Sequence, residues 1–396
     1  MRPPLIERVT VEGYRALRDV HLKGVQPLTV LVGPNGSGKS TFFDVFAFLG
    51  ECFSDGVRRA CDKRNGLADM RSRGYDGPVR LEFAYREAPG ERLMTYVLEL
   101  AEHGGRPVIS KELLRWSVAP SGGRPTHVLE FANGSGFVVD EATGEKTPQT
   151  LAEPDLLAVN ALGQLKDHPR VEALRRFITG WHVSYLTASA ARGVPEAGPQ
   201  EHLSRSGENL ANVLQYLREQ HPDRLRSILA SLSSSIPQLE SATDELSPDG
   251  RLVLWLKDAP FERPVLSRYA SDGTLKMLAY LVLLHDPDPA PFIGIEEPEN
   301  YLYPTLLEGL ATQCKVAAER SQVLVTSHSH EFLNALDPGE VVLFARDESG
   351  YTKVHRPLDV TGIGSMLDAG AHLGWLWREG YLEAPRPELT VPDQTA

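Results

Sequence analysis

The sequence predicts an α/β protein in which a mixed sheet surrounds a central helix and a mainly helical lobe is inserted. Three observations lead to this fold class. A short apolar, β-branched run at 28–32 is followed by a glycine-rich loop and a helical pattern. A second apolar run at 292–295 ends in two acids. Between them, residues 151–237 change to the 3.6-residue periodicity of amphipathic helices.

The composition is that of an ordinary globular protein. The chain has 396 residues, of which 41% are hydrophobic and 24% are charged, enough for one large or two medium domains. No apolar run reaches the length of a membrane span and the first residues lack the apolar core of a signal peptide, so we expect a cytoplasmic protein. Cys52, Cys61 and Cys314 lack metal-ligand spacing and are expected to be reduced thiols. The net charge of −12 argues mildly against nucleic-acid binding.

The first predicted lobe spans residues 1–150 and begins with a hairpin formed by strands at 6–12 and 17–24. A basic stretch at 56–74 holds six basic and two acidic residues; we interpret it as a solvated face, with a nucleic-acid contact as the alternative. Alternating patterns predict strands at 79–86, 93–101 and 107–117, and a hairpin of 126–131 with 136–140.

Residues 33–40 spell G-x-x-x-x-G-K-S, the pattern of a phosphate-binding loop. Glycines let backbone N–H groups close around a phosphate, and the helix that follows adds its positive dipole end. An accidental glycine-rich turn is the alternative, but the strand before and the helix after it favour a nucleoside triphosphate with Mg²⁺. The predicted nucleotide-binding residues are Gly33, Pro34, Asn35, Gly36, Ser37, Gly38, Lys39, Ser40 and Thr41. Lys39 would reach the terminal phosphates, and the Ser40 hydroxyl would ligate the metal.

The insertion at 151–237 is predicted to contain helices near 156–165, 171–177, 209–218 and 223–232, a strand at 182–186 and a loop at 188–206. No heptad pattern is sustained, so we expect no long coiled coil. The second lobe, 238–350, begins with strands at 239–242 and 252–256. The segment 351–396 holds an aromatic helix at 372–381, with Trp375 and Trp377, and a partly disordered tail.

Acids and a histidine follow two apolar strands of the second lobe. Glu296 is predicted to hold the metal, and Glu297 to orient or deprotonate the attacking water. His328 follows a strand at 322–325 and is predicted to hydrogen-bond the γ-phosphate. The alternatives are an exposed acid pair at a strand end and a structural histidine.

Ser271, Asp272 and Gly273 open a predicted helix. Such a sequence is a capping arrangement, and it is equally an anion site made of a hydroxyl, backbone N–H groups and a helix dipole.

The order GPNGSGKST, ASDGT, FIGIEEPENYLYP and VTSHSHEF resembles the ABC-type ATPases of the RecF/SMC/OLD branch, above all their short-armed, stand-alone bacterial members. GYRALRDV and SGENLANVLQYL are also similar to that branch, and the resemblance covers roughly residues 5–345. It implies an ABC-type head in which Ser271-Asp272-Gly273 contact the γ-phosphate held by a second protomer. Two ATPs would then be enclosed in a head-to-tail homodimer, with 300–302 near the interface.

The sequence departs from the ABC signature LSGGQ at Ala270, Asp272 and Thr274, which puts the strength of that dimer in question. The usual lid glutamine cannot be assigned, and Gln149 and Gln164 are the candidates.

Together these patterns predict a Mg-ATP-dependent ATPase that dimerises around ATP and switches a separate effector. Lys39, Glu297 and His328 are its predicted catalytic residues. Relatives act in DNA maintenance and repair and in phage defence. No nuclease motif is recognisable, so the effector is expected to be another polypeptide, contacted through the insertion or the Trp375/Trp377 segment. A DNA-binding clamp gated by ATP is one alternative, and a transporter subunit, which predicts a closer LSGGQ and a shorter chain, is another.

Overall fold

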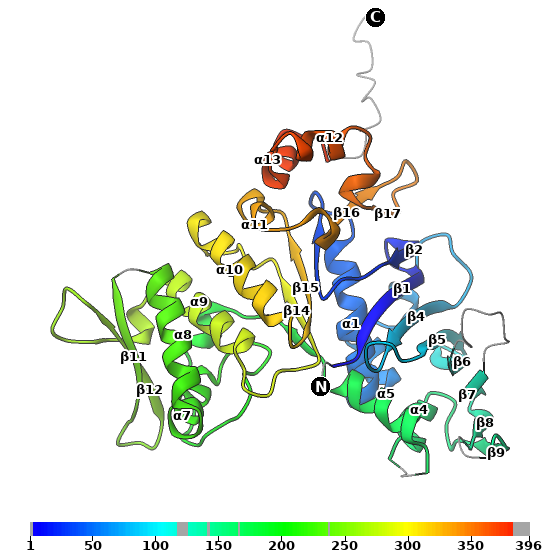
Figure 1. Cartoon of the computed structure of the whole chain (residues 1–396). Helices are drawn as coiled ribbons and strands as arrows, with labels where there is room; N and C mark the ends of the chain where they lie inside the picture. Colours follow the sequence, from blue (N-terminus) through cyan, green and yellow to red (C-terminus); the bar gives the residue numbers. More distant parts are fainter. Residues whose placement is uncertain (1–2, 117–125, 141–142, 165–166, 237, 383–396) are drawn as a thin grey trace, which may run out of the picture. The chain divides into compact units, whose positions relative to one another are not determined.

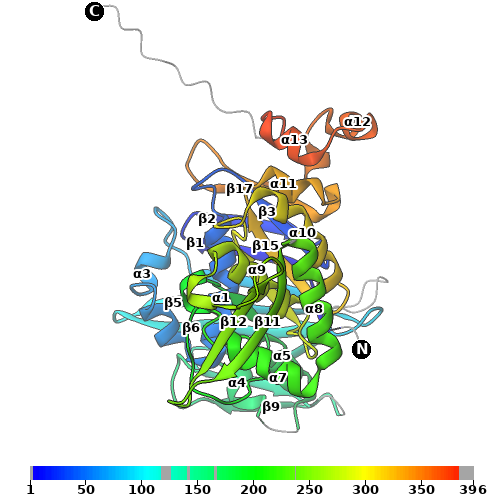
Figure 2. The same ribbon diagram turned by 90° about the vertical axis from the view of Figure 1, so that its left-hand side faces the viewer.

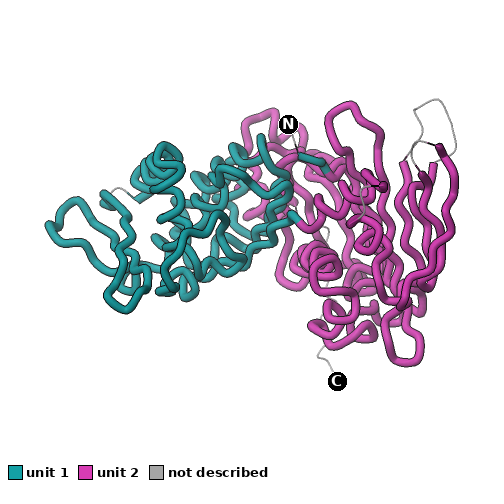
Figure 3. Tube along the Cα trace, turned by 90° about the horizontal axis from the view of Figure 1, so that it is seen from below, with its two compact units in different colours: residues 1–5, 180–335 teal, residues 6–179, 336–396 magenta. Residues whose placement is uncertain are grey.

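A computed structural model describes residues 3–116, 126–140, 143–164, 167–236 and 238–382. The chain forms two compact units (Figure 3). Unit 1 comprises residues 1–5 and 180–335, and unit 2 comprises residues 6–179 and 336–396. The range 151–237 is therefore divided between the units, and each unit is described by itself. The tail beyond residue 382, where disorder was expected, lies outside the described residues.

The larger sheet of unit 2 has the strand order β2-β1-β4-β5-β6-β7-β8-β9 (Figure 1). Antiparallel pairing joins β1 to β2 and each neighbour from β4 to β9, with Leu81 opposite Leu98 in one such pair. Both predicted hairpins and the three alternating strands are confirmed. The strands are β1 Leu5–Tyr14, β2 Leu17–Lys23, β4 Val79–Arg86, β5 Leu93–His103, β6 Arg106–Trp116, β7 Thr126–Ala132, β8 Ser135–Val139 and β9 Lys146–Thr150.

Helix α1 (Lys39–Ser54) packs on strands of two different sheets in unit 2. Strand β3 (Leu28–Val32) leads into it and pairs in parallel with β16 (Val341–Arg346), which pairs antiparallel with β17 (Thr352–His355). The Phe42 ring lies 5.5 Å from Phe344 on β16, and the Phe46 ring lies 5.4 Å from Phe83 on β4. Because large rings fill both contacts, the start of α1 is fixed in position.

The basic stretch 56–74 forms α2 (Val57–Asp62), α3 (Leu67–Met70) and the connections around them. Arg64, with a side chain only 7% exposed, donates hydrogen bonds to Asp44 and Glu51 of α1. Lys63 Nζ lies 2.7 Å from Asp55. Arg64 is therefore buried against acids of α1, and the expectation of a solvated face is wrong for this residue, whereas the Lys63 side chain is 52% exposed.

The remaining helices of unit 2 are short, and a buried carboxylate holds the first of them. Glu112 on β6 accepts hydrogen bonds from the N–H groups of Ala158 at 2.5 Å and Val159 at 3.2 Å, and from the Tyr96 hydroxyl at 3.0 Å. Burial raises the pKa of Glu112 to about 7, against the opposing effect of these donors. These helices are α4 Ala158–Leu162, α5 Pro169–Thr179, α12 Ile363–Asp368 and α13 Leu373–Arg378, with 3-10 turns η2 Pro338–Glu340 and η3 Pro357–Asp359.

Unit 1 contains three parallel strands in the order β10-β14-β15, with bounds His182–Ser184, Phe292–Glu296 and Gln322–Ser327. Their carboxyl ends lie at one edge, and Glu296 is opposite Thr326 there. The expected loop at 188–206 begins with a helical turn, because Thr187 accepts the Ala190 N–H. The accompanying helices are α6 Ala188–Ala191, α9 Asp272–Leu284, α10 Pro304–Ala317 and α11 His330–Asn334.

The other part of unit 1 combines two helices with a small antiparallel sheet. Helices α7 (Leu210–Gln220) and α8 (Pro222–Ser235) lie along the hairpin of β11 (Leu239–Leu246) and β12 (Leu252–Asp258), as Figures 1 and 2 show. Strand β13 (Val265–Leu266) and the 3-10 turn η1 (Ser267–Tyr269) continue from the hairpin towards α9. Across the described ranges, α1 with 16 residues is the longest helix, so no long coiled-coil arm is present there and no helix has the length and apolarity to cross a membrane.

Candidate functional site

The phosphate loop of unit 2 has two positions that accept only glycine. A Cβ on Gly33 would lie 2.3 Å from the Phe344 carbonyl oxygen, and a Cβ on Gly38 would lie 2.1 Å from Thr352 Oγ1. Gly38 has φ of 105° and Gly36 has φ of 78°, both in the left-handed region. The loop is therefore closed against β16 and β17, and its glycines are required by packing as well as by backbone conformation.

Polar groups of the loop are arranged to surround an anion. Lys39 Nζ donates to Gly33 O at 2.7 Å and to Pro34 O at 3.2 Å, which places the ammonium over the loop. The Ser37 hydroxyl is buried and has no hydrogen-bond partner, whereas Ser40 is exposed. At the described start of α1, no side chain caps the N-terminus and the first turn holds no acid, so its amides remain open to an anion.

These features fit a bound triphosphate. The cradle excludes Cβ atoms where backbone must approach closely, and it supplies a cation, hydroxyls and a helix N-terminus. Lys39 would hold the terminal phosphates, Ser40 would be a metal ligand, and the backbone N–H groups of residues 35–41 would donate to the phosphate oxygens.

Glu297, the predicted water-activating acid, is held in an unusual backbone conformation at the end of β14. Its φ is 41°, a region that non-glycine residues adopt rarely and at some cost. Its N–H donates to Thr326 O at 3.0 Å and to Thr326 Oγ1 at 3.1 Å. The Asn300 side-chain amide donates to Glu297 Oε2 at 3.1 Å. The backbone and the carboxylate of Glu297 are thus both oriented by neighbours.

A third acid, Glu299, joins the loop after β14 to the loop after β15. Its Oε1 accepts from the His328 N–H at 2.7 Å and the Ser327 hydroxyl at 3.1 Å, and it lies 3.1 Å from His328 Nδ1. The side chain is 9% exposed, and its other oxygen is buried without a partner. His328 Nδ1 also lies 4.0 Å from Glu297 Oε1. The structure thus brings the predicted Glu297 and His328 together, with Glu299 between their loops.

Helix α9 carries the predicted signature residues and contacts the Glu297 loop at two points. A Cβ on Gly273 would lie 3.1 Å from Tyr301 O, and Lys276 Nζ donates to Asn300 O at 2.7 Å. Burial lowers the pKa of Lys276, while the charges of Glu299 and Glu297 oppose that shift. The start of α9 is therefore packed against and hydrogen-bonded to the loop 297–302.

Ser271 is the N-cap of α9. Its hydroxyl accepts the Thr274 N–H at 3.1 Å and lies 2.8 Å from Thr274 Oγ1. The capping interpretation is thereby confirmed, and the remaining amides of the first turn are those that an anion would use.

Comparison with known proteins now adds the family. A family model described as an AAA domain, putative AbiEii toxin of type IV toxin–antitoxin systems, matches residues 28–96 and 140–334. The chain belongs to this AAA-domain family.

Solved structures give the fold. An SMC head bound to the C-terminal winged-helix domain of ScpA is 15% identical, with a TM-score of 0.52, covering 89% of this chain and 97% of that one. An SMC head from Thermotoga maritima is 16% identical, with a TM-score of 0.42, and the match covers 90% of this chain and 99% of that one. A further SMC head, bound to a ScpA domain derived from Pyrococcus furiosus, is 14% identical, with a TM-score of 0.46 and coverage of 92% and 100%. This AAA-domain protein thus shares the fold of an SMC head, the fold that the resemblance of its motifs to ABC-type ATPases of the RecF/SMC/OLD branch implies.

In this AAA-domain protein, the predicted site residues fall into two groups. Residues 33–41 belong to unit 2, whereas Ser271, Asp272, Gly273, Glu296, Glu297 and His328 belong to unit 1. Gln149 lies exposed on β9, and Gln164 donates to Asn160 O at 3.2 Å, so neither candidate lid glutamine gains support. Sequence reasoning missed Glu299 and Lys276, although the third acid of the string EEPEN was a visible signal for the first.

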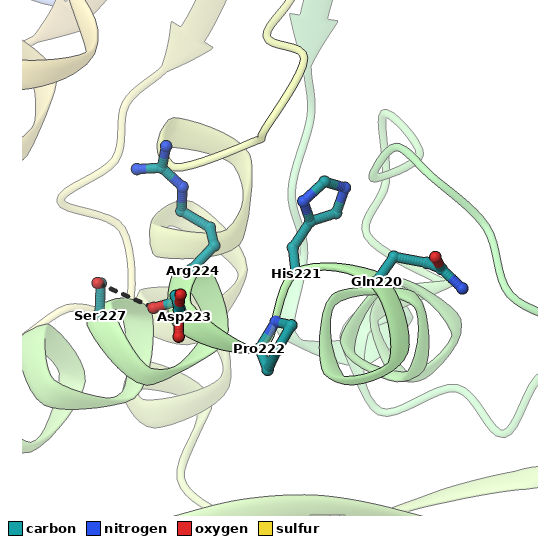
Figure 4. Close-up of a pocket in the computed structure, with 6 residues that line it drawn as sticks. All are labelled: Gln220, His221, Pro222, Asp223, Arg224 and Ser227. Atoms are coloured by element: carbon teal, nitrogen blue, oxygen red, sulfur yellow. Dashed lines mark hydrogen bonds between the residues drawn. The ribbon is translucent and has the colours of Figure 1, made fainter.

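The described chain has no cluster of metal-ligating side chains, and a cavity between α7 and α8 contains none of the predicted site residues. Groups of three or more histidines, cysteines and acids that could hold a metal are not found in the described ranges, and the three cysteines are buried thiols. A cavity of about 360 Å³ lies where α7 meets α8 (Figure 4), and its residues include none of those predicted; they are Gln220, His221, Pro222, Asp223, Arg224 and Ser227. Ser227 donates to Asp223 O at 3.1 Å there, which is an ordinary helix contact.

Proposed function

We propose that this protein binds Mg-ATP at its phosphate loop, hydrolyses it with the help of the acids at the end of β14, and switches a separate effector. The observation that carries this proposal is the closed phosphate loop, with Lys39 over the loop and glycines that admit no Cβ. The oriented carboxylate of Glu297 supplies the second half of the chemistry.

Each residue then has a defined task. Lys39 and the amides of the loop bind the β- and γ-phosphates and place the γ-phosphoryl group. Ser40 and Glu296 would hold Mg²⁺, which neutralises charge on the phosphates when bound. Glu297 orients the attacking water and accepts its proton, and His328 donates a hydrogen bond to the γ-phosphate. His328 contacts both Glu297 and Glu299, so it can respond to the presence of that phosphate.

A second copy of the chain would complete each site. The amides and the Ser271 hydroxyl at the start of α9 form a surface for the γ-phosphate of the partner protomer. Tyr269 lies two residues before Ser271, the carbonyl of Tyr301 lies beside Gly273, and Tyr303 follows in the same loop; all three side chains are more than 70% exposed. Aromatic side chains of this kind are enriched in protein interfaces, which supports ATP-dependent dimerisation.

The effector is proposed to be another polypeptide in a process such as phage defence or DNA maintenance. One related SMC head is bound to a winged-helix domain of ScpA, so heads of this fold can carry a protein partner. The exposed side chains of Trp375 and Tyr381, whose rings lie 5.5 Å apart, supply a candidate contact on the C-terminal segment.

Replacing Glu297 with glutamine tests the proposal. The variant keeps the Asn300 hydrogen bond but loses the base, so we expect tight ATP binding, a stable dimer in ATP and Mg²⁺, and hydrolysis lowered by at least about a hundredfold. Light scattering and phosphate release measure these properties. Glu308→Gln, an exposed acid on α10, is the matched control and should match the wild type. A Glu297→Gln protein that stays monomeric in ATP would refute the composite site, and one that hydrolyses normally would refute the assigned base.

A further inference from the structure

Arg192, directly after α6, makes two contacts with the signature segment 270–274. Its guanidinium forms an ion pair with Asp272, and Nη2 donates to Ala270 O at 2.8 Å. The Arg192 side chain is 28% exposed and that of Asp272 is 40% exposed. Both contacts lie within unit 1 and flank Ser271, the N-cap of α9.

Asp272 presents an electrostatic difficulty for an anion site. It stands where LSGGQ has a glycine, and its carboxylate is in the first turn of the helix that would face a triphosphate. A carboxylate stabilises a helix N-terminus, but it repels a phosphate that approaches the same amides. The guanidinium of Arg192 pairs with this carboxylate, and a positive charge there opposes the repulsion.

We propose that Arg192 is a positioning residue of the composite ATP site, an inference that rests on the proposed function. Arg192 neutralises Asp272 and fixes the Ala270 carbonyl. The Ser271 hydroxyl and the α9 amides therefore face the γ-phosphate of the partner protomer without a net negative charge beside them. The departure from the glycine-rich signature is compensated by a cation from a different element.

The test uses the full-length Glu297→Gln protein as parent, with ATP and Mg²⁺, and measures the dimer dissociation constant by sedimentation. Arg192→Ala should weaken the dimer about tenfold, equivalent to about 1.4 kcal/mol. ATP binding to the monomer should change less than about twofold, because the phosphate loop is untouched. Asp272→Gly in the Arg192→Ala background removes the carboxylate that needs neutralising, so the double variant should regain most of the parent affinity.

Two controls separate charge neutralisation from folding. Arg218 on α7 contacts both the carboxylate and the carbonyl of Asp244, so Arg218→Ala removes a similar pair elsewhere in unit 1 and should leave the dimer unchanged. Arg192→Gln keeps a donor for Ala270 O but carries no charge, and it should weaken the dimer as alanine does. The inference would be overturned if Arg192→Ala or Arg192→Gln dimerised as tightly as the parent. It would also be overturned if the Arg192→Ala/Asp272→Gly double variant dimerised as weakly as Arg192→Ala. A parent that does not dimerise in ATP would instead refute the proposed function.

Discussion

Replacing Glu299 with alanine removes the acceptor that joins the two catalytic loops. The variant leaves the His328 N–H, the Ser327 hydroxyl and the His328 ring without their shared partner. A hydrogen bond to a charged group contributes about 1.5–3 kcal/mol. Since the His328 side chain is 45% exposed, water can replace its ring contact, and the backbone bond dominates the loss. If this loss raises the activation free energy of hydrolysis by about 2 kcal/mol, kcat decreases about 30-fold.

Single-turnover hydrolysis of ATP, with ATP affinity measured separately, tests this value. Glu299→Gln retains an acceptor oxygen and should lose much less activity than alanine. Because Glu299 acts through His328, the Glu299→Ala/His328→Ala double variant should be no slower than His328→Ala alone. Normal kcat in Glu299→Ala alongside a defective His328→Ala, or fully additive losses, would refute the argument that Glu299 positions the histidine.

Two predictions concern the free energy of unfolding. Because the pKa of Glu112 is raised in the folded protein, the wild type should lose stability as pH rises from about 4.5 to about 7. Glu112→Gln should remove this contribution, so its free energy of unfolding, measured with urea, should depend less on pH. Equal pH dependence in both proteins would show that the pKa of Glu112 is not raised in the folded protein. Arg64→Ala should lower the free energy of unfolding by about 3 kcal/mol, because it removes the buried cation shared by Asp44 and Glu51. Lys63→Ala, at a side chain 52% exposed, should cost less than about 1 kcal/mol, and similar losses in both variants would show that burial of Arg64 does not matter.

Local patterns in the sequence were sufficient for most elements of the fold. The apolar runs at β3, β14 and β15 are short, continuous and followed by turn residues, so their type could be recognised without tertiary information. The helical turn at residues 188–191 could not be predicted, because it depends on a cap from Thr187 and has too few residues to show a periodic pattern. The pairing of Arg64 with α1 was also hidden, since charge alone does not show whether a cation faces water.

The candidate site also combines features that could be predicted from the local sequence with features that could not. The phosphate loop and the acids are contiguous motifs, whereas the roles of Arg192 and Lys276 depend on partners far along the chain. Nothing in the local sequence around Arg192 indicates that Asp272 is its partner. The meeting of the phosphate loop with Glu296 at one triphosphate stays a prediction, for which the Glu297→Gln experiment is the test.

The contact of Thr352 with the phosphate loop has a consequence for how the protein is made. The Thr352 hydroxyl donates to Ser37 O at 2.8 Å, and its side chain occupies the space that a Cβ on Gly38 would need. A nascent chain that ends before β17 already carries the glycine-rich loop, both acids and the histidine, but it lacks this support. The ribosome must therefore translate beyond β17 before the nucleotide cradle can take its final shape.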